Sequence, residues 1–172
     1  MPVLTKGSFA LNLGIVRVSG ELSEVDRQCA WELYAELSTR VAVTGKQRDP
    51  DCENFENELY VESFDSLYHF FTAAREIMKK FPVGKVGTNS NHLGVIISDA
   101  MSNVMRPFLE KWQVPYRHWW ENQSNPRRPP LERQNEYPDL SEMLADWAAL
   151  RWLMRQLQSD LVSIYRLRDL NT

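Results

Sequence analysis

Apolar residues recur at helical spacing along most of this chain. The most regular stripe steps by four and three residues and holds Tyr60, Phe64, Leu67, Phe71, Ala74, Met78 and Phe81. Side chains at this spacing share one face of an α-helix, which favours burying that face. Pro82, Gly84 and Gly87 follow the stripe and stop it. The spacing therefore predicts a helix over 60–81, with the stripe in the core.

A second stripe predicts a helix from about Glu24 to Val43. Ser23 followed by Asp26 has the form of a capping box, which satisfies free N–H groups at a helix start. The apolar positions of this helix are Ala30, Leu33, Tyr34, Leu37 and Val41. Gly45 ends the helix, and the polar residues 45–52 indicate a loop.

A third helix is predicted to begin after Thr88 or Ser90, either of which can serve as its N-cap. Its buried face is expected to hold Leu93, Ile97, Ala100, Val104 and Phe108. Pro107 lies inside this pattern, where it removes one backbone hydrogen bond and crowds the carbonyl group of Asn103. We expect a kink or a break there, and a further interruption at Pro115.

The fourth helix opens at Pro138, Asp139 and Glu142, again an arrangement of the capping-box kind. Its apolar positions are Trp147, Leu150, Met154, Leu157, Leu161 and Ile164. Four amphipathic helices with mostly short connections predict an all-α protein, an antiparallel four-helix bundle with a kinked third helix. Residues 1–172 are expected to form one domain, with 122–138 as a connecting loop.

Residues 1–22 are predicted to form an extended N-terminal arm or single strand. Leu11, Leu13 and Ile15 alternate on one face while Val16 and Val18 alternate on the other, which indicates a strand with a bulge. A lone strand is not stable, and its only candidate partner, 39–44, is assigned to a helix. Two alternatives remain: the arm packs across its own bundle, or it pairs with a copy of itself in a homo-oligomer.

Composition narrows the functional classes without naming one. A charged fraction of 25%, a hydrophobic fraction of 43% and a net charge of -3 describe an ordinary globular protein with no overall attraction to nucleic acid or anionic lipid. No apolar run approaches the roughly 20 residues that cross a bilayer, and the start lacks the features of a signal peptide. We therefore expect a cytoplasmic protein that does not bind membranes. Cys29 and Cys52 do not form a disulfide or zinc-binding pattern.

Motifs for catalysis are not found. His69, His92 and His118 lack the Glu-x-x-His spacing of di-metal bundles, and neither of the two common nucleotide-phosphate loops is present. The Gly-containing segment 84–90 is best explained as a turn between helices. No catalytic residue, metal or cofactor is therefore predicted.

The tract from Val104 to Arg133 is locally rich in cations and aromatic rings on an acidic chain. Cations neutralise phosphate and rings stack on bases, so the tract suits a nucleic acid or a nucleotide. Trp, Tyr and Arg are also the favoured anchors of protein interfaces. With Arg75 from the preceding helix, the candidate binding residues are Arg75, Arg106, Lys111, Trp112, Arg117, Trp119, Arg127 and Arg128. A purely structural alternative stays open, because Trp112 lies on a core stripe and Arg75 and Arg106 can pair with neighbouring acids.

Small helical bundles of this size resemble the HEPN ribonucleases, but the Arg and His spacing of that family's motif is absent here. The runs 12–20, 31–40, 66–68 together with 75–77, and 104–112 are similar to those of a group of uncharacterised bacterial helical proteins. That resemblance covers about 12–121 and implies a bacterial cytosolic protein, part of a defence or conflict gene system. It implies no activity.

Two functions follow as hypotheses. The first is a non-catalytic binding or assembly protein of a bacterial cytosolic complex, such as an antiphage defence complex, which recognises another protein or its own copy. The alternative is a nucleic-acid or nucleotide-binding helical domain, possibly related to HEPN nucleases but with an atypical site.

Overall fold

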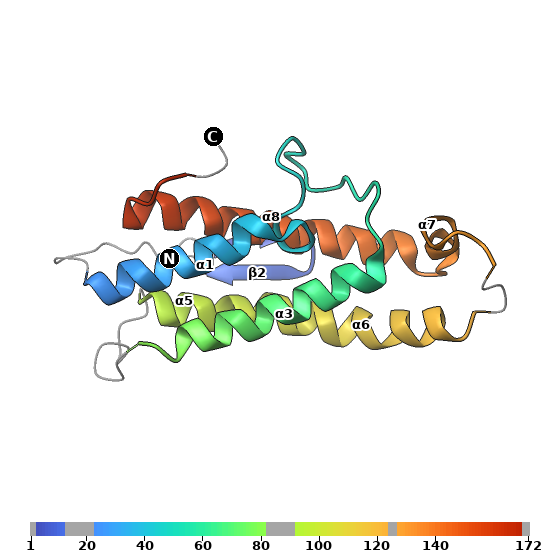
Figure 1. The fold of residues 1–172 in the computed structure, drawn as a ribbon, viewed down its shortest axis with the longest axis horizontal. Coiled ribbons are helices and arrows are strands. Elements are labelled where there is room, and N and C mark those ends of the chain that lie inside the picture. The colour runs from blue at the N-terminus through green and yellow to red at the C-terminus, as the bar shows by residue number, and fades with distance from the viewer. Residues whose placement is uncertain (1–2, 13–22, 82–91, 124–126, 170–172) are drawn as a thin grey trace.

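The computed structural model describes residues 3–12, 23–81, 92–123 and 127–169. Within them the protein is mostly helical, with one small two-stranded sheet (Figure 1). The strands are β1 (Val3–Lys6) and β2 (Phe9–Asn12), and the helices are α1 (Glu24–Thr39), α2 (Val41–Thr44), α3 (Tyr60–Met78), α5 (Leu93–Ala100), the π-helix η1 (Met101–Met105), α6 (Arg106–Glu121), α7 (Pro130–Arg133), the 3₁₀-helix η2 (Gln134–Glu136) and α8 (Leu140–Tyr165). The predicted loop 122–138 thus contains two short helical elements.

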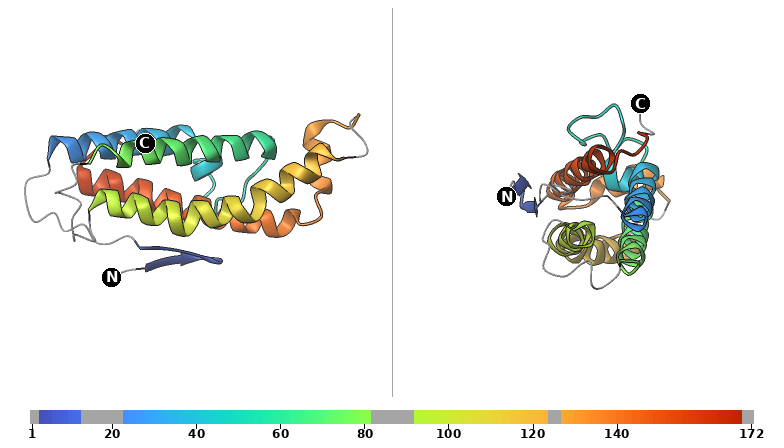
Figure 2. Two further views of the ribbon diagram at one scale, coloured as in Figure 1. Left: turned by 90° about the horizontal axis from the view of Figure 1, so that it is seen from below. Right: turned by 90° about the vertical axis from the view of Figure 1, so that its left-hand side faces the viewer.

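Four long helical segments lie side by side: α1, α3, α8 and the continuous run α5–η1–α6. The end-on view in Figure 2 shows them grouped around a common interior. Helix α1 packs against α8 and α3, and α3 packs in turn against α5 and α6. The β-hairpin lies outside this group, against α8, α5 and η1. None of the described helices is both long and apolar enough to cross a membrane.

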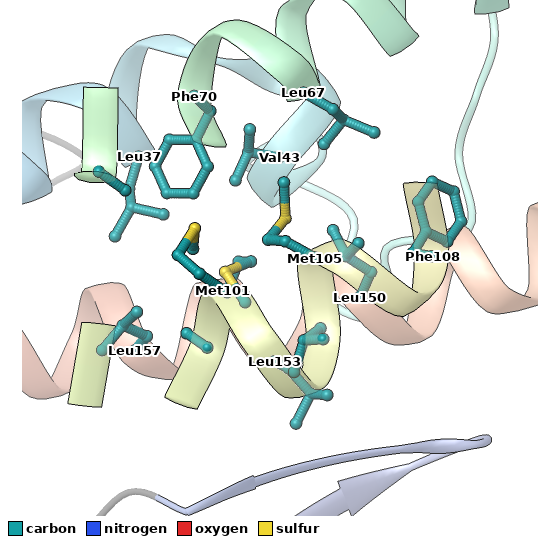
Figure 3. Close-up of a cluster of buried hydrophobic side chains, with 14 of the residues drawn as sticks. Leu37, Val43, Leu67, Phe70, Met101, Met105, Phe108, Leu150, Leu153 and Leu157 are labelled. Atoms are coloured by element: carbon teal, nitrogen blue, oxygen red, sulfur yellow. The ribbon is translucent and has the colours of Figure 1, made fainter. Parts of the chain in front are cut away.

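The core is one continuous cluster of apolar side chains from all of these segments. Trp147 of α8 is fully buried, with ring centroids 4.7 Å from Phe64 and 5.3 Å from Phe108. Figure 3 shows part of the cluster, with Leu37, Val43, Leu67, Phe70, Met101, Met105, Phe108, Leu150, Leu153 and Leu157 labelled. The five predicted apolar positions of the third helix, from Leu93 to Phe108, are all buried.

Helix α3 buries a slightly different face from the predicted one. Phe70 is fully buried, whereas Phe71, which the stripe placed in the core, is only partly buried. Ile77 likewise takes the buried place expected for Met78. Steps of three and four residues both keep a side chain near one helix face. The packing of α1, α5 and α6 on α3 determines which residue of each pair is buried. The predicted stripe is therefore wrong by one residue at these two positions.

The first predicted helix is divided in two. Arg40 has extended backbone angles (φ -118°, ψ 97°) and separates α1 from α2. Ala42 and Val43 therefore face the core, while Val41, expected to be buried, is 43% exposed. The predicted cap at Ser23 is confirmed, since its Oγ accepts a hydrogen bond from the Asp26 N–H at 3.2 Å.

The predicted start of the fourth helix is confirmed, because Asp139 is the N-cap of α8. The expected capping-box hydrogen bond is not formed, since the Asp139 side chain makes no capping hydrogen bond.

Pro107 does not break the third helical segment. The chain instead forms the π-helix η1 just before it, and the Arg106 N–H donates to the Met101 carbonyl five residues back. A π-turn is wider than an α-turn, which gives room to a ring that would crowd the preceding carbonyl group. Pro115 does not interrupt the helix either, because α6 continues to Glu121.

The N-terminus forms a hairpin rather than the predicted single strand. β1 pairs antiparallel with β2, with Leu4 opposite Leu11 and Lys6 opposite Phe9. Gly7 has φ +60° in the two-residue turn, a conformation that glycine adopts without strain. Phe9 and Leu11 are buried against the helices, so the described part of the arm packs on its own chain. The expected alternation from Leu13 to Val18 lies outside the described residues.

We predict that Trp147→Ala and Phe70→Ala each lower the free energy of unfolding by about 3–5 kcal/mol, because each leaves a large cavity in the core. Phe71→Ala is the matched control and should cost clearly less, since its ring is partly exposed. Urea denaturation of the three variants measures the difference. Equal losses for Phe70→Ala and Phe71→Ala would contradict the helix phase described for α3.

Candidate functional site

Helix α6 carries most of the predicted binding residues, and its two faces differ. Phe108, Leu109, Trp112 and Tyr116 recur at helical spacing and are buried. The opposite side is exposed, including Val114 at 72%. The C-terminal end of α6 and α7 lie at the same end of the molecule (Figure 1), and side chains of α6 contact Arg133 and Tyr137 of the tract after residue 127. This region is the strongest candidate for a binding surface.

A group of aromatic rings and one guanidinium forms this surface, which we call the aromatic end: Tyr116, Trp119, Trp120, Arg133 and Tyr137. Tyr116 is fully buried at its centre, and its ring lies 5.6 Å from Trp119 and 6.2 Å from Trp120. Tyr137 packs edge-on against both Tyr116 and Trp119 at 5.1 Å. The two tryptophans are only partly buried, so each keeps part of its surface exposed.

Arg133 covers one face of Trp120. Its guanidinium carbon lies 3.8 Å from the ring centroid, a cation–π contact. The next residue, Gln134, anchors this turn to α3, because its Oε1 accepts from the Tyr60 N–H at 2.9 Å and its Nε2 donates to the Glu58 carbonyl at 2.7 Å. Gln134 is 3% exposed. The aromatic end is therefore held in place by buried hydrogen bonds on its inner side.

The tyrosines of the aromatic end remain neutral phenols at pH 7. Burial is the main cause that raises the pKa of Tyr116 far above its usual value, and burial also raises the pKa of Tyr137. The Tyr116 hydroxyl makes no hydrogen bond to the described residues. A neutral, buried phenol contributes packing and shape here, and it does not carry charge to a ligand.

Lys111 and Trp112 of the predicted site are used inside the molecule. The Trp112 indole N–H donates to Asp146 Oδ2 at 2.9 Å, and its ring is 4% exposed. Lys111 Nζ lies 2.8 Å from the same Asp146 oxygen and 2.7 Å from Glu142 Oε1. The hydrogen bonds that Lys111 donates to Asp146 and Glu142 raise the pKa of Lys111. Both residues connect α6 to α8, and the Trp112 ring is not presented for stacking.

Two of the predicted arginines are also paired. Arg117 Nη2 lies 2.5 Å from Asp65 Oδ1 of α3, and Arg128 forms an ion pair with Glu136. Arg75, Arg106 and Arg127 are exposed and make no ion pair among the described residues. The partners expected for Arg75 and Arg106 on neighbouring helices are therefore not seen.

The eight predicted residues do not form one site. Arg106 and Trp119 lie at opposite ends of α6, which at 1.5 Å per residue separates them by about 20 Å. Arg75 lies ten residues beyond Asp65 on α3, about 15 Å along that helix from the pair with Arg117. Only Trp119, Arg117 and the 127–128 segment belong to the neighbourhood of the aromatic end.

Four members of the aromatic end, Tyr116, Trp120, Arg133 and Tyr137, were not among the predicted binding residues. Trp120 and Arg133 stood in the tract singled out for its cations and rings, but no spacing rule links them, because they lie thirteen positions apart across a turn. Only the fold places the guanidinium on the ring.

A second feature that the sequence analysis missed is the buried ion pair of Arg151 and Glu58. Arg151 is fully buried, and its Nη2 lies 2.5 Å from Glu58 Oε2. Its guanidinium also stacks on Phe55 at 4.1 Å, and its Nε donates to the Ala42 carbonyl at 3.3 Å. Burial lowers the pKa of Arg151, and Glu58 opposes that shift. The signal was present, since Arg151 interrupts the apolar run 147–154 on the buried stripe.

No group of three or more metal-ligand side chains gathers anywhere in the part of the chain that the structure describes.

The chain matches no protein-family model, and searches of curated proteins and of solved structures found no match either.

We predict that Arg151→Met lowers the free energy of unfolding by about 3–5 kcal/mol, because it leaves the Glu58 carboxylate buried without its partner. Replacing both residues, as in Arg151→Met with Glu58→Met, should cost less than the sum of the single changes. A double-mutant cycle by urea denaturation measures this coupling. Arg117→Ala, at an exposed pair, is the control and should cost at most about 1 kcal/mol. Additive effects of the Arg151 and Glu58 changes would contradict the pairing.

Proposed function

We propose that this chain is a non-catalytic binding and assembly protein that recognises another protein through its aromatic end. The observation that carries the proposal is the pair of partly exposed tryptophans, Trp119 and Trp120, which both pack near the buried Tyr116, with Arg133 stacked on Trp120 at 3.8 Å. Trp, Tyr and Arg dominate the binding energy of protein interfaces. Side chains that are already ordered lose little entropy on binding, which favours affinity.

The surroundings of the aromatic end support a protein partner. Leu131 of α7, two positions before Arg133, is 43% exposed, which adds an exposed apolar side chain to this part of the chain. Arg127 is exposed and adds a charge at the edge that has no ion pair among the described residues. An apolar centre with a charged rim is the usual composition of an interface.

The ion pairs of the basic residues favour protein recognition over nucleic-acid binding as the function. Lys111, Arg117 and Arg128 each lie next to a carboxylate, which reduces the positive potential available to phosphate. Trp112 is buried and cannot stack on a base. Nucleic-acid or nucleotide binding is therefore the second candidate, and the experiment below includes it as a competing outcome.

We also propose a structural role for the helices and a bacterial complex in which the protein acts. The four long helical segments would act as an antiparallel four-helix bundle that serves as a rigid support for the binding surface. The resemblance of 12–121 to bacterial helical proteins is the basis for proposing a cytoplasmic role in a bacterial complex, such as one that acts in antiphage defence. The partner is then another component of that complex or a second copy of this chain.

We predict that Arg127→Glu with Arg128→Glu leaves the free energy of unfolding within about 0.5 kcal/mol of wild type but weakens capture of the partner from the native host. Trp120→Ala should weaken capture further, because it removes an anchor ring. The measurement is affinity capture with the purified full chain as bait, with the recovered proteins and nucleic acids identified separately. Light scattering of each variant reports self-association.

Arg75→Glu with Lys79→Glu is the control, with the same change of charge on exposed residues at the C-terminal end of α3, away from the aromatic end. Recovery of the same proteins by both double variants would overturn the proposal. Salt-sensitive binding of a labelled single-stranded oligonucleotide, lost in the Arg127 and Arg128 variant, would instead establish the second candidate.

A further inference from the structure

A polar cleft of about 600 Å³ lies between the end of α1, the segment after α2 and the C-terminal half of α8. This volume is in the range of small-molecule sites, about 300–1,000 Å³. It is distinct from the aromatic end, which is built from α6, α7 and the start of α3. Its wall combines two cations, several uncharged hydrogen-bonding groups and one carboxylate.

The two cations of the wall, Arg155 and Lys46, have only uncharged partners. Arg155 donates to the Thr44 carbonyl from Nε at 3.0 Å and from Nη2 at 2.7 Å, to the Lys46 carbonyl at 2.8 Å and to the Asp49 carbonyl at 2.5 Å. Lys46 Nζ donates to Asn54 Oδ1 at 2.7 Å and to the Glu56 carbonyl at 2.6 Å. Neither forms an ion pair with a described carboxylate. Carbonyl groups solvate a cation but leave its net charge, so the wall remains positive.

Uncharged donors stand beside these cations. Gln158 is 8% exposed, and its Nε2 donates to Ser38 Oγ at 2.9 Å across the α1–α8 contact. Ser38 Oγ donates in turn to the Tyr34 carbonyl at 2.7 Å. Ser159, on the next position of α8, is exposed in the cleft. Hydroxyl and amide groups next to guanidinium and ammonium groups are the donors that proteins use for oxyanions.

The cleft already holds one carboxylate, and it comes from the chain itself. Asp169 lies after α8, and its Oδ1 accepts a hydrogen bond from the Tyr34 hydroxyl at 2.9 Å. Tyr34 is fully buried, so its hydroxyl is aimed at the cleft from a fixed position. The residue after α8 therefore contributes a carboxylate to the same cleft that Arg155 and Lys46 line.

We propose that this cleft binds a small polar ligand that carries an oxyanion, and that Asp169 competes with it electrostatically. The ligand's oxyanion lies near Arg155 and Lys46, and its polar body contacts Ser159 and the wall of α8. Phosphate and carboxylate groups share this chemistry. The assignment is independent of the aromatic end, and either can fail without the other.

The test is titration calorimetry of the full chain with inorganic phosphate and, separately, with succinate, each against sodium chloride of equal ionic strength. Ser159→Glu adds a carboxylate at the exposed wall and should weaken anion binding about tenfold through charge repulsion. Ser163→Glu is the control, because it makes the same change on an exposed position one turn further along α8, outside the cleft lining. Asp169→Asn removes the internal charge and should tighten binding about threefold.

Saturable binding of either anion that follows this order of variants supports the proposal, and the tighter of the two anions identifies the group the cleft prefers. No saturable binding above the chloride control overturns it. An equal loss for Ser159→Glu and Ser163→Glu also overturns it, because the effect would then come from overall charge. Thermal melts of all three variants establish that each is folded, and the exposed positions of Ser159 and Ser163 make both substitutions compatible with the fold.

Discussion

Three side chains at four-residue spacing on α8 hold the connection between α2 and α3, and much of the structure depends on them. The Trp147 indole N–H donates to the Ala42 carbonyl at 2.8 Å, Arg151 pairs with Glu58, and Arg155 binds the carbonyl groups of Thr44, Lys46 and Asp49. Residues 45–59 have no regular helix or strand. Their backbone polar groups would otherwise need water or each other as partners. Side chains of α8 donate to several carbonyl groups of this connection, and turns within the connection pair others, such as the Cys52 N–H with the Asp49 carbonyl.

Both candidate sites depend on this connection. At one side, Arg155 draws the segment 44–46 toward α8, and Gly45 allows the approach, since a Cβ there would lie 3.2 Å from Arg155 Nη2. That approach forms a wall of the polar cleft. At the other side, Glu58 offers its carbonyl group to Gln134, which fixes the turn that carries Arg133 onto Trp120. The buried pair of Arg151 and Glu58 thus links the position of α3 to the shape of the aromatic end.

Ion pairs with other elements explain why residues 104–133, a basic tract in the sequence, present less free positive charge in the folded protein. Lys111, Arg117 and Arg128 lie within reach of acids on other elements, and these pairs are worth little stability while they reduce the free positive charge. A linear sequence shows the cations of residues 104–133 together but not the acids Asp65, Glu136 and Asp146 that come to them. The aromatic residues remain as the distinguishing feature of that region.

The helical segments follow from local patterns in the chain, because periodicity, caps and breakers act over a few residues. The helical spacing of α3, α8 and the α5–η1–α6 run, and the Ser23 cap, were predictable for that reason. Features that depend on long-range contacts were not. Phe70 rather than Phe71 is buried in the core, because both residues fit the helical period and only packing against the neighbouring helices distinguishes them. β1 pairs with β2, where one strand alone was expected. Pro107 follows the π-helix η1 and Pro115 lies inside α6, where interruptions were expected. The tertiary structure also brings Arg133 to Trp120 and Arg151 to Glu58, residues that are far apart in the chain and that no local rule can join.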